Sequence, residues 1–253
     1  MKSQVAFNEV VRRARVLDRA ELTPALLQAL GSVVPFEMAC WGLLDPATLW
    51  PVTNCSSSSD SVAALRAWEY ELTIPDVTKI AELARAAHHV GVLSAATDGH
   101  LDRSARYRMV LAPLGVSDEL RAVLTVDGTS WGWLALFRFS ASTFTMAEAA
   151  SVEQLVPHLA RAWRAALLAA NSGTIPLDAA PAVVVVDEAG RVDALTPAAQ
   201  DLLDQLPRGR AGPAPDVLGA LAVSARAAAA REPPAPGPDQ TMTRTMLPGA
   251  DGS

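Results

Sequence analysis

The segment LRAVLTVDGTSWGWLALFRF, Leu120–Phe139, carries the clearest structural signal of the chain. Apolar residues occupy every second position as far as Val126, and the alternation resumes at Trp131. A period of two is typical of a strand that buries one face, and Asp-Gly between two such runs is typical of a tight turn. The segment therefore predicts an antiparallel hairpin whose turn is Asp127-Gly128.

The longest predicted helix follows this hairpin and covers residues 146–170. Thr145 and Glu148 have the spacing of a capping box, in which each side chain accepts a hydrogen bond from the other residue's backbone N–H. Apolar residues then recur at helical spacing through Val152–Leu167. The pattern predicts one long helix with a continuous apolar stripe.

Helices and strands also precede the hairpin. An amphipathic N-terminal helix is predicted in residues 1–17, and a second helix begins at Pro24, a residue that suits the first helical position. Apolar runs at 36–44 and 49–54, joined by an Asp-Pro turn, predict two paired strands. Shorter helices and a strand then lead to the hairpin, so residues 18–170 are expected to form one α+β domain.

A second, smaller unit follows a linker predicted at residues 171–181. The segment AVVVVDEAGRVDAL, residues 182–195, predicts a hairpin, and Thr196-Pro197 predicts the start of a helix by cap and first-turn proline. Residues 242–253 predict a strand that runs into a turn with no returning strand. A strand without a partner leaves its backbone groups unsatisfied, so residues 182–253 are expected to be an incomplete domain of a longer protein.

The composition excludes several classes of function. The net charge is −6 with basic residues spread along the chain, whereas a nucleic-acid-binding segment needs a clustered basic face. No apolar run approaches the roughly 20 residues of a membrane-spanning helix, and the N-terminus lacks the apolar core of a secretion signal. With only two cysteines, reduced thiols are expected. The sequence thus predicts a cytoplasmic protein without a membrane partner.

Several short motifs resemble the sensory half of actinobacterial LuxR-type transcriptional regulators. They are TKIAELAR (78–85), LSAAT (93–97), RSARYR (103–108), PLG (113–115), DELR (118–121) and Trp131-Gly132. The order of elements over residues 18–170 resembles a GAF domain, and residues 182–253 resemble the start of a PAS domain. The resemblance implies an α+β fold with a GAF-like antiparallel sheet flanked by helices, followed by an incomplete PAS-like α+β segment.

The same resemblance implies a function. Such a module is a non-catalytic sensor that binds a small molecule or a partner and acts on a helix-turn-helix DNA-binding domain, which this sequence does not contain. Aromatic walls suit a small ligand, and the candidate ligand-binding residues are Trp41, Trp68, Tyr70, Tyr107 and Trp133. The alternative is that these side chains only fill the core.

A charged pair is a second candidate for the site. Cyclic-nucleotide GAF domains close their pocket with a lysine–aspartate ion pair, and Lys79 and Asp118 match that pattern in part, although the family's asparagine and phenylalanine are missing here. The partial match implies a lid ion pair between Lys79 and Asp118. An ordinary surface ion pair of small energetic value is the alternative.

No motif with a catalytic mechanism appears, and no cysteine or carboxylate stands beside the histidines at a metal-binding spacing. We therefore expect no enzyme activity, no cofactor and no metal. The apolar stripes of the terminal helices predict a homodimer, with packing against the domain's own sheet as the alternative. Two interpretations of the function stay open. One is a ligand-responsive regulator, and the alternative is a ligand-free scaffold for dimerisation and protein interaction.

Overall fold

A computed structural model describes most of the predicted α+β domain and a short part of the second unit. The described residues are 2–14, 24–46, 48–49, 51, 55–57, 70–71, 74–140, 142–170, 183–186 and 192–205. The linker predicted at 171–181, the strand predicted at 242–253 and the candidate ligand residue Trp68 lie outside these ranges.

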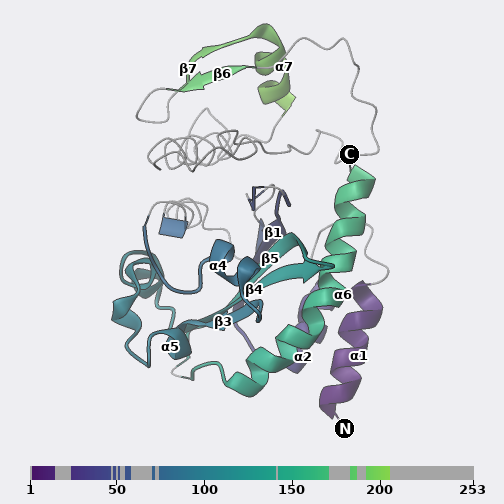
Figure 1. The fold of residues 1–253 in the computed structure, drawn as a ribbon, viewed down its shortest axis with the longest axis vertical. Helices are drawn as coiled ribbons and strands as arrows, with labels where there is room; N and C mark the ends of the chain where they lie inside the picture. The colour runs from purple at the N-terminus through teal and green to yellow at the C-terminus, as the bar shows by residue number, and fades with distance from the viewer. Residues whose placement is uncertain are drawn as a thin grey trace.

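A five-stranded antiparallel sheet in the order β2-β1-β5-β4-β3 forms the middle of the domain (Figure 1). Its strands are β1 Met38–Leu43, β2 Cys55–Ser56, β3 Val90–Val92, β4 Asp118–Val126 and β5 Thr129–Arg138. The predicted hairpin is confirmed as β4 and β5. Asp127 and Gly128 both have positive φ, 52° and 74°, which is the conformation of a tight turn that matches the twist of its strands.

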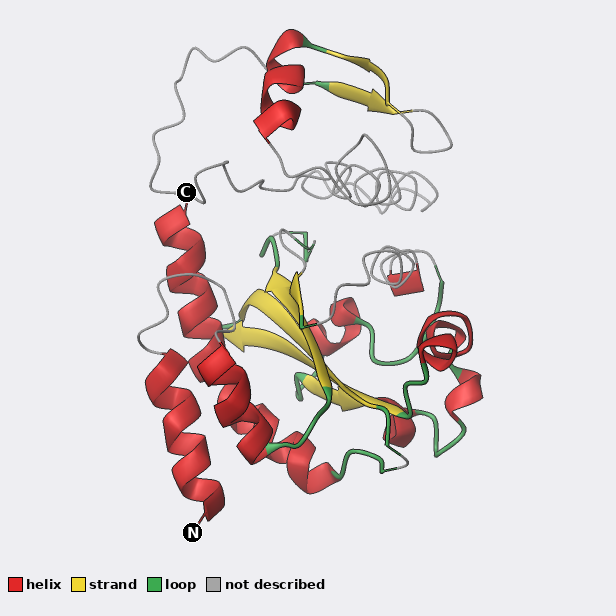
Figure 2. Cartoon of the chain, turned by 180° about the vertical axis from the view of Figure 1, so that it is seen from behind, coloured by secondary structure: helices red, strands yellow, loops and turns green. Residues whose placement is uncertain are grey.

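Helices cover both faces of the sheet (Figure 2). On one face lie α1 Lys2–Ala14, α2 Pro24–Val33 and α6 Met146–Ala170. On the other lie α4 Ile80–Arg85, α5 Leu93–Ala96, the short 3-10 helices η1 Leu101–Arg103 and η3 Ala112–Leu114, and the π-helix η2 Tyr107–Leu111. The α+β architecture predicted from the sequence is therefore confirmed for this part of the chain.

The capping box at the start of α6 forms as predicted. The Thr145 N–H donates to Glu148 Oε2 at 2.8 Å, and the Glu148 N–H donates to Thr145 Oγ1 at 3.2 Å. Two backbone donors that the first turn leaves without helical partners are thus satisfied. Glu148 also binds Arg138 at the end of β5, with 2.6 Å between Oε1 and Nη2, so the start of α6 is fixed to the sheet.

Two apolar clusters fill the space on either side of the sheet. The first lies under α1, α2 and α6 and includes Leu30, Leu120, Leu136, Leu155 and Trp163. The second lies under α4, α5 and η2 and includes Ile80, Leu93, Val123, Trp133 and Phe137. All nine residues of β4 are buried, and because successive side chains point to opposite faces, this strand contributes to both sides.

Gly132 on β5 lets α6 approach the sheet closely. A Cβ at this position would lie 2.3 Å from Cδ1 of Trp163 and 2.8 Å from the carbonyl oxygen of Gly42. The Trp163 indole N–H donates to that same oxygen at 3.2 Å, and only 1% of the Trp163 surface is exposed. The absence of a side chain at Gly132 is therefore what admits the tryptophan.

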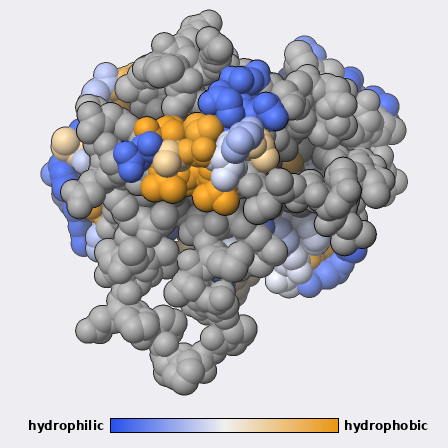
Figure 3. Space-filling model, turned by 90° about the horizontal axis from the view of Figure 1, so that it is seen from above, coloured by the Kyte–Doolittle hydropathy of each residue, from blue (hydrophilic) through white to orange (hydrophobic). Residues whose placement is uncertain are grey.

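The described part of the second unit is a hairpin followed by a helix, β6 Val184–Val186, β7 Val192–Leu195 and α7 Pro197–Gln205. Thr196 caps the helix as predicted, because its Oγ1 accepts the Ala199 N–H at 3.3 Å. Val183, Val185 and Val192 are more than a third exposed, and apolar side chains gather on the surface of this hairpin (Figure 3). The local elements are confirmed, and the PAS-like assignment stays a prediction.

Candidate functional site

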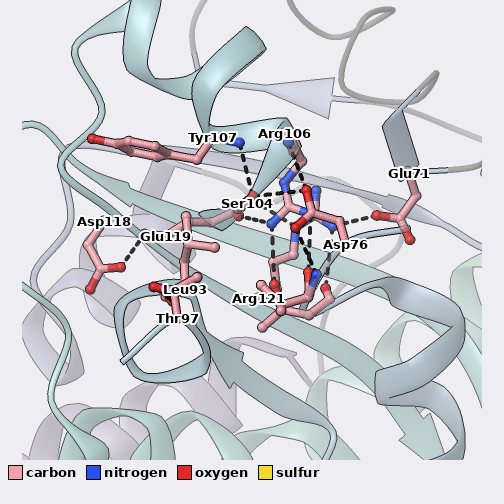
Figure 4. A network of polar contacts seen from close by, with 12 residues as sticks. Glu71, Asp76, Leu93, Thr97, Ser104, Arg106, Tyr107, Asp118, Glu119 and Arg121 are labelled. Carbon is pink, nitrogen blue, oxygen red and sulfur yellow. Dashed lines mark hydrogen bonds and ion pairs between the residues drawn. The ribbon is translucent and has the colours of Figure 1, made fainter. Parts of the chain in front are cut away.

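Four ionisable side chains meet inside the domain, on the face of the sheet that α4, α5 and η2 cover. We call Glu71, Arg106, Glu119 and Arg121 the buried charge cluster (Figure 4). Glu119 and Arg121 lie two residues apart on β4, so both point to the same face. Arg106 directly precedes η2, and each of the four residues is less than 9% exposed.

The ion pairs of the cluster form a chain in which carboxylates and guanidiniums alternate. Arg106 Nη2 lies 2.5 Å from Glu119 Oε2, and Arg121 Nε lies 2.8 Å from Glu119 Oε1. At the far end, Arg121 Nη1 lies 2.5 Å from Glu71 Oε2. The second Glu71 oxygen, Oε1, accepts the Ile80 N–H at 2.6 Å. Two positive and two negative groups balance, so the cluster as a whole is neutral.

Glu119 and Arg121 stay ionised in spite of burial. Burial opposes the ionisation of Glu119, but the neighbouring guanidiniums of Arg106 and Arg121 outweigh it and hold the pKa of the Glu119 carboxyl below its ordinary value. Burial likewise acts against the charged form of Arg121, and the carboxylates of Glu119 and Glu71 overcome it and raise the pKa of Arg121. Glu119 and Arg121 therefore both carry their charge at neutral pH.

A carboxylate beside the cluster fixes the backbone that carries Arg106. Asp76 Oδ2 accepts the Arg106 N–H at 2.7 Å and the Ser104 hydroxyl at 2.9 Å, and its Oδ1 accepts the Val77 N–H at 2.8 Å. In turn Ser104 Oγ accepts the Tyr107 N–H at 3.0 Å. These bonds hold the start of η2 against the segment before α4.

Thr78 completes the site with a strained backbone. Its φ of 54° lies in the left-handed region, which is uncommon for a threonine. Its Oγ1 accepts from Arg106 Nη2 at 3.2 Å, and its carbonyl oxygen lies 3.5 Å from Arg121 Nη1. Gly91 on β3 makes room for it, since a Cβ there would lie 2.8 Å from Thr78 Cγ2. The strain thus places both Thr78 oxygens on the two arginines.

The buried charge cluster is an expensive way to fill a core. A buried ion network seldom stabilises a fold more than apolar side chains of the same volume would, and strongly perturbed groups gather at functional sites. Arg106 Nε is also buried, and none of the described residues gives it a hydrogen-bond partner. The opposite face of the sheet is packed by the apolar first cluster. This asymmetry makes the charged face the candidate functional site.

The structure divides the predicted aromatic residues between the two faces. Trp133 is buried in the second apolar cluster, and Tyr70 and Tyr107 pack against it, on the face of the buried charge cluster. Trp41 belongs to the first cluster, under the terminal helices. The proposed set with Trp41 is therefore corrected, since a residue on the opposite side of the sheet cannot share a pocket with the other three.

The predicted lid ion pair between Lys79 and Asp118 is not formed. Lys79 Nζ is exposed and donates to the carbonyl oxygen of Ile74 at 2.9 Å. Asp118 is buried and accepts the Ser94 N–H at 3.0 Å and the Phe144 N–H at 2.8 Å. The alternation of β4 explains the correction, because Asp118 and Glu119 point to opposite faces and only Glu119 faces the α4 side.

Glu71, Arg106 and Arg121 were missed by the sequence analysis. A signal existed for Arg121, since it is a charged residue inside a predicted strand, two places after Glu119 and so on the same face. Arg106 stands among other arginines in RSARYR, so nothing in the sequence distinguishes it. Within the described ranges, no group of three or more histidine, cysteine, aspartate or glutamate side chains could hold a metal ion. Nor does any helix there combine the length and apolarity needed to cross a membrane.

No family model and no curated protein matches this chain. Among solved structures, the VqsR LBD domain from Pseudomonas aeruginosa is 17% identical with a TM-score of 0.45, covering 64% of this chain and 97% of that one. The GAF domain from a phosphoenolpyruvate-protein phosphotransferase of Coxiella burnetii is 14% identical with a TM-score of 0.47, covering 66% and 96%. The phycoerythrobilin-bound GAF domain from a cyanobacterial phytochrome is 13% identical with a TM-score of 0.39, covering 66% and 97%.

These are likenesses of fold at low sequence identity, and they assign this chain no ligand and no partner. The sheet order and the helices on both faces agree with the antiparallel sheet flanked by helices that the sequence resemblance implies.

Proposed function

We propose that this domain is a non-catalytic sensory module that binds a small molecule on the face of the sheet that carries the buried charge cluster. The observation that supports the proposal is the asymmetry of the two faces. The face under α1, α2 and α6 holds the first apolar cluster and the ion pair Arg138–Glu148, whereas the other face holds two arginines and two glutamates away from water. A domain that needed only stability would gain as much from apolar packing on both faces.

Strand β4 connects the face that carries the buried charge cluster to helix α6 on the other face. Glu119 and Arg121 face the cluster, while Leu120 and Ala122, the residues that alternate with them, belong to the apolar cluster under α6. A ligand that shifts Glu119 or Arg121 therefore moves residues in contact with α6. A signal also requires that the ligand bind one of two arrangements more tightly, because equal affinity shifts no population.

The output we propose is the regulation of transcription, as the resemblance to LuxR-type regulators implies. Ligand binding would reach a DNA-binding domain outside this sequence through α6 and the PAS-like segment. A homodimer through α1 and α6 would present two such domains to DNA. Residues 182–253 would act as the connector.

The experiment couples the chain to a measurable output. Fractions of small metabolites are first screened for those that raise the thermal midpoint of unfolding of the purified 253-residue chain. The chain is then fused to a DNA-binding domain of known operator, and the expression of a reporter gene is measured with and without each fraction. We expect a fraction that stabilises the chain also to change the reporter. Arg121→Gln should abolish both effects, and Arg164→Gln, at an exposed position on α6, should abolish neither. If no fraction changes either readout, the ligand-free scaffold is the better interpretation.

A further inference from the structure

We infer that the Glu71 carboxylate occupies a binding position for a ligand carboxylate, formed by the Arg121 guanidinium and the Ile80 N–H, which we call the seat. The chain binds an apolar monocarboxylic acid when the acid's carboxylate displaces that of Glu71 from the seat. The inference depends on the sensory function proposed above. Its starting point is that Glu71 is bound at its carboxylate in the way proteins bind a free acid. One oxygen accepts a backbone N–H from Ile80 at 2.6 Å, and the other accepts from Arg121 Nη1 at 2.5 Å.

The seat keeps its shape without Glu71. Arg121 Nε is held by Glu119 at 2.8 Å, and its Nη1 also lies 3.5 Å from the Thr78 carbonyl oxygen. Ile80 is fixed at the start of α4, where the Leu83 N–H donates to the Lys79 carbonyl oxygen at 2.9 Å. The guanidinium and the backbone donor are therefore positioned by contacts other than those to Glu71, which is the preorganisation that a binding site needs.

The charges of the cluster select a monoanion. With Glu71 withdrawn, Arg106 and Arg121 carry two positive charges against the single negative charge of Glu119, so one negative charge restores balance. Asp76 does not supply it, since within the described residues its carboxylate accepts from two backbone N–H groups and a hydroxyl rather than from a guanidinium. The buried Nε of Arg106, which has no hydrogen-bond partner among the described residues, adds a donor that a more polar occupant could use.

The surroundings of the seat select an apolar body for the acid. Ile80, Leu83, Val123 and Trp133 belong to the second apolar cluster, and Tyr70, the neighbour of Glu71, packs against it. An acid with an aromatic or short aliphatic body would bury that body among them when Glu71 leaves. Ligand and glutamate thus compete for one place.

Competition from a tethered group predicts how affinity changes. A group on the same chain acts at an effective concentration on the order of millimolar, so free acid must exceed it to displace Glu71. Glu71→Gln keeps the shape and an acceptor for the Ile80 N–H but removes the charge that pairs with Arg121. The variant should therefore bind a monocarboxylate at least about tenfold more tightly than the natural chain.

The experiment uses the full 253-residue chain and two matched probes, sodium phenylacetate and its neutral isostere phenylacetamide. Dissociation constants are measured by calorimetry for the natural chain, Glu71→Gln and the control Glu148→Gln. The control removes a carboxylate of α6 that pairs with Arg138 on β5, away from the seat. We expect phenylacetate to bind Glu71→Gln at least about tenfold more tightly than the other two chains, and phenylacetamide to bind none. Measurable phenylacetate affinities that are equal in the three chains, or measurable affinities that are equal for the two probes, overturn the inference.

A second variant covers the case in which phenylacetate is too large. Glu71→Ala leaves the seat empty, and sodium acetate should raise its thermal midpoint at concentrations where sodium chloride and acetamide do not. The midpoint of the natural chain should not respond to acetate. No selective response in Glu71→Ala, together with no phenylacetate binding to Glu71→Gln, overturns the inference.

The two proposals fail separately. A metabolite that binds the natural chain and Glu71→Gln equally and changes the reporter refutes the seat but leaves the sensory function intact. Acid binding that is tightened in Glu71→Gln and never changes the reporter supports the seat and contradicts the sensory function.

Discussion

Replacing Glu119 with glutamine should destabilise the domain more than any other single loss of charge in it. Glu119 is 1% exposed and receives Arg106 on one oxygen and Arg121 on the other. In Glu119→Gln the cluster changes from neutral to a net charge of +1, because only Glu71 is left against two guanidiniums. Removing one partner of a buried ion pair costs about 3–5 kcal/mol, and we expect a value near the lower end since glutamine keeps one acceptor.

Urea unfolding of the full chain, followed by circular dichroism at 222 nm, measures this loss. With a denaturant dependence of about 2 kcal/mol per molar, the midpoint should fall by about 1.5 M. Glu148→Gln is the matched control. Its carboxylate pairs with Arg138 nearer the surface, and glutamine preserves a capping box, so a cost of about 1 kcal/mol or less is expected.

A double variant separates the cost of an uncompensated charge from the loss of contacts. Glu119→Gln with Arg106→Gln restores a neutral cluster, so it should be no less stable than Glu119→Gln alone. If the second substitution instead adds a full further cost, the charge balance derived from the structure is wrong. The reasoning is also refuted if Glu119→Gln costs no more than Glu148→Gln.

Three further outcomes are expected, each measured by the same urea titration. Gly132→Ala should lower the free energy of unfolding by about 1–3 kcal/mol, because the new methyl group overpacks against Trp163. The control Gly31→Ala in α2 should be neutral or stabilising, because its new Cβ meets only a side-chain carbon at 3.8 Å. Equal effects of the two substitutions contradict the close approach of α6. Thr145→Ala should cost about 0.5–2 kcal/mol through the lost cap, and an unchanged midpoint would show that the capping box does not contribute. Because the pKa of Glu119 is lower in the folded chain, the unfolded chain binds more protons in acid, so the free energy of unfolding should fall as the pH drops below about 4. In Glu119→Gln this fall should be less steep. If the pH profiles of the variant and the natural chain are parallel, Glu119 is not the source of the pH dependence.

The sequence predicted those elements whose signals are local. Asp127-Gly128 specifies a turn from two residues, and Thr145 with Glu148 specifies a helix start from four, so the β4–β5 hairpin and the beginning of α6 could be placed in advance. Such signals depend only on neighbours along the chain. The α+β architecture followed from their order.

The site could not be predicted in the same way, because its contacts join distant segments. Glu71 and Arg121 lie 50 residues apart, and Arg106 and Glu119 lie 13 residues apart with η2 and η3 between them. Asp118 is the neighbour of Glu119 on β4, and one residue along a strand is the difference between one face of the sheet and the other. Trp41 was misplaced for the same reason, since composition identifies an aromatic residue without its face.

The short edge of the sheet at β3 has a consequence for how copies of this chain can meet. This strand is three residues long, and the chain turns into α5 at Leu93 directly after it. Just before it, the His89 N–H is already taken by Glu153 of α6 at 3.0 Å. A long edge with unused donors is a template for strand-to-strand aggregation, and this edge is only three residues long. Self-association on this side is therefore expected to proceed through helix surfaces, which can separate again, rather than through a growing sheet.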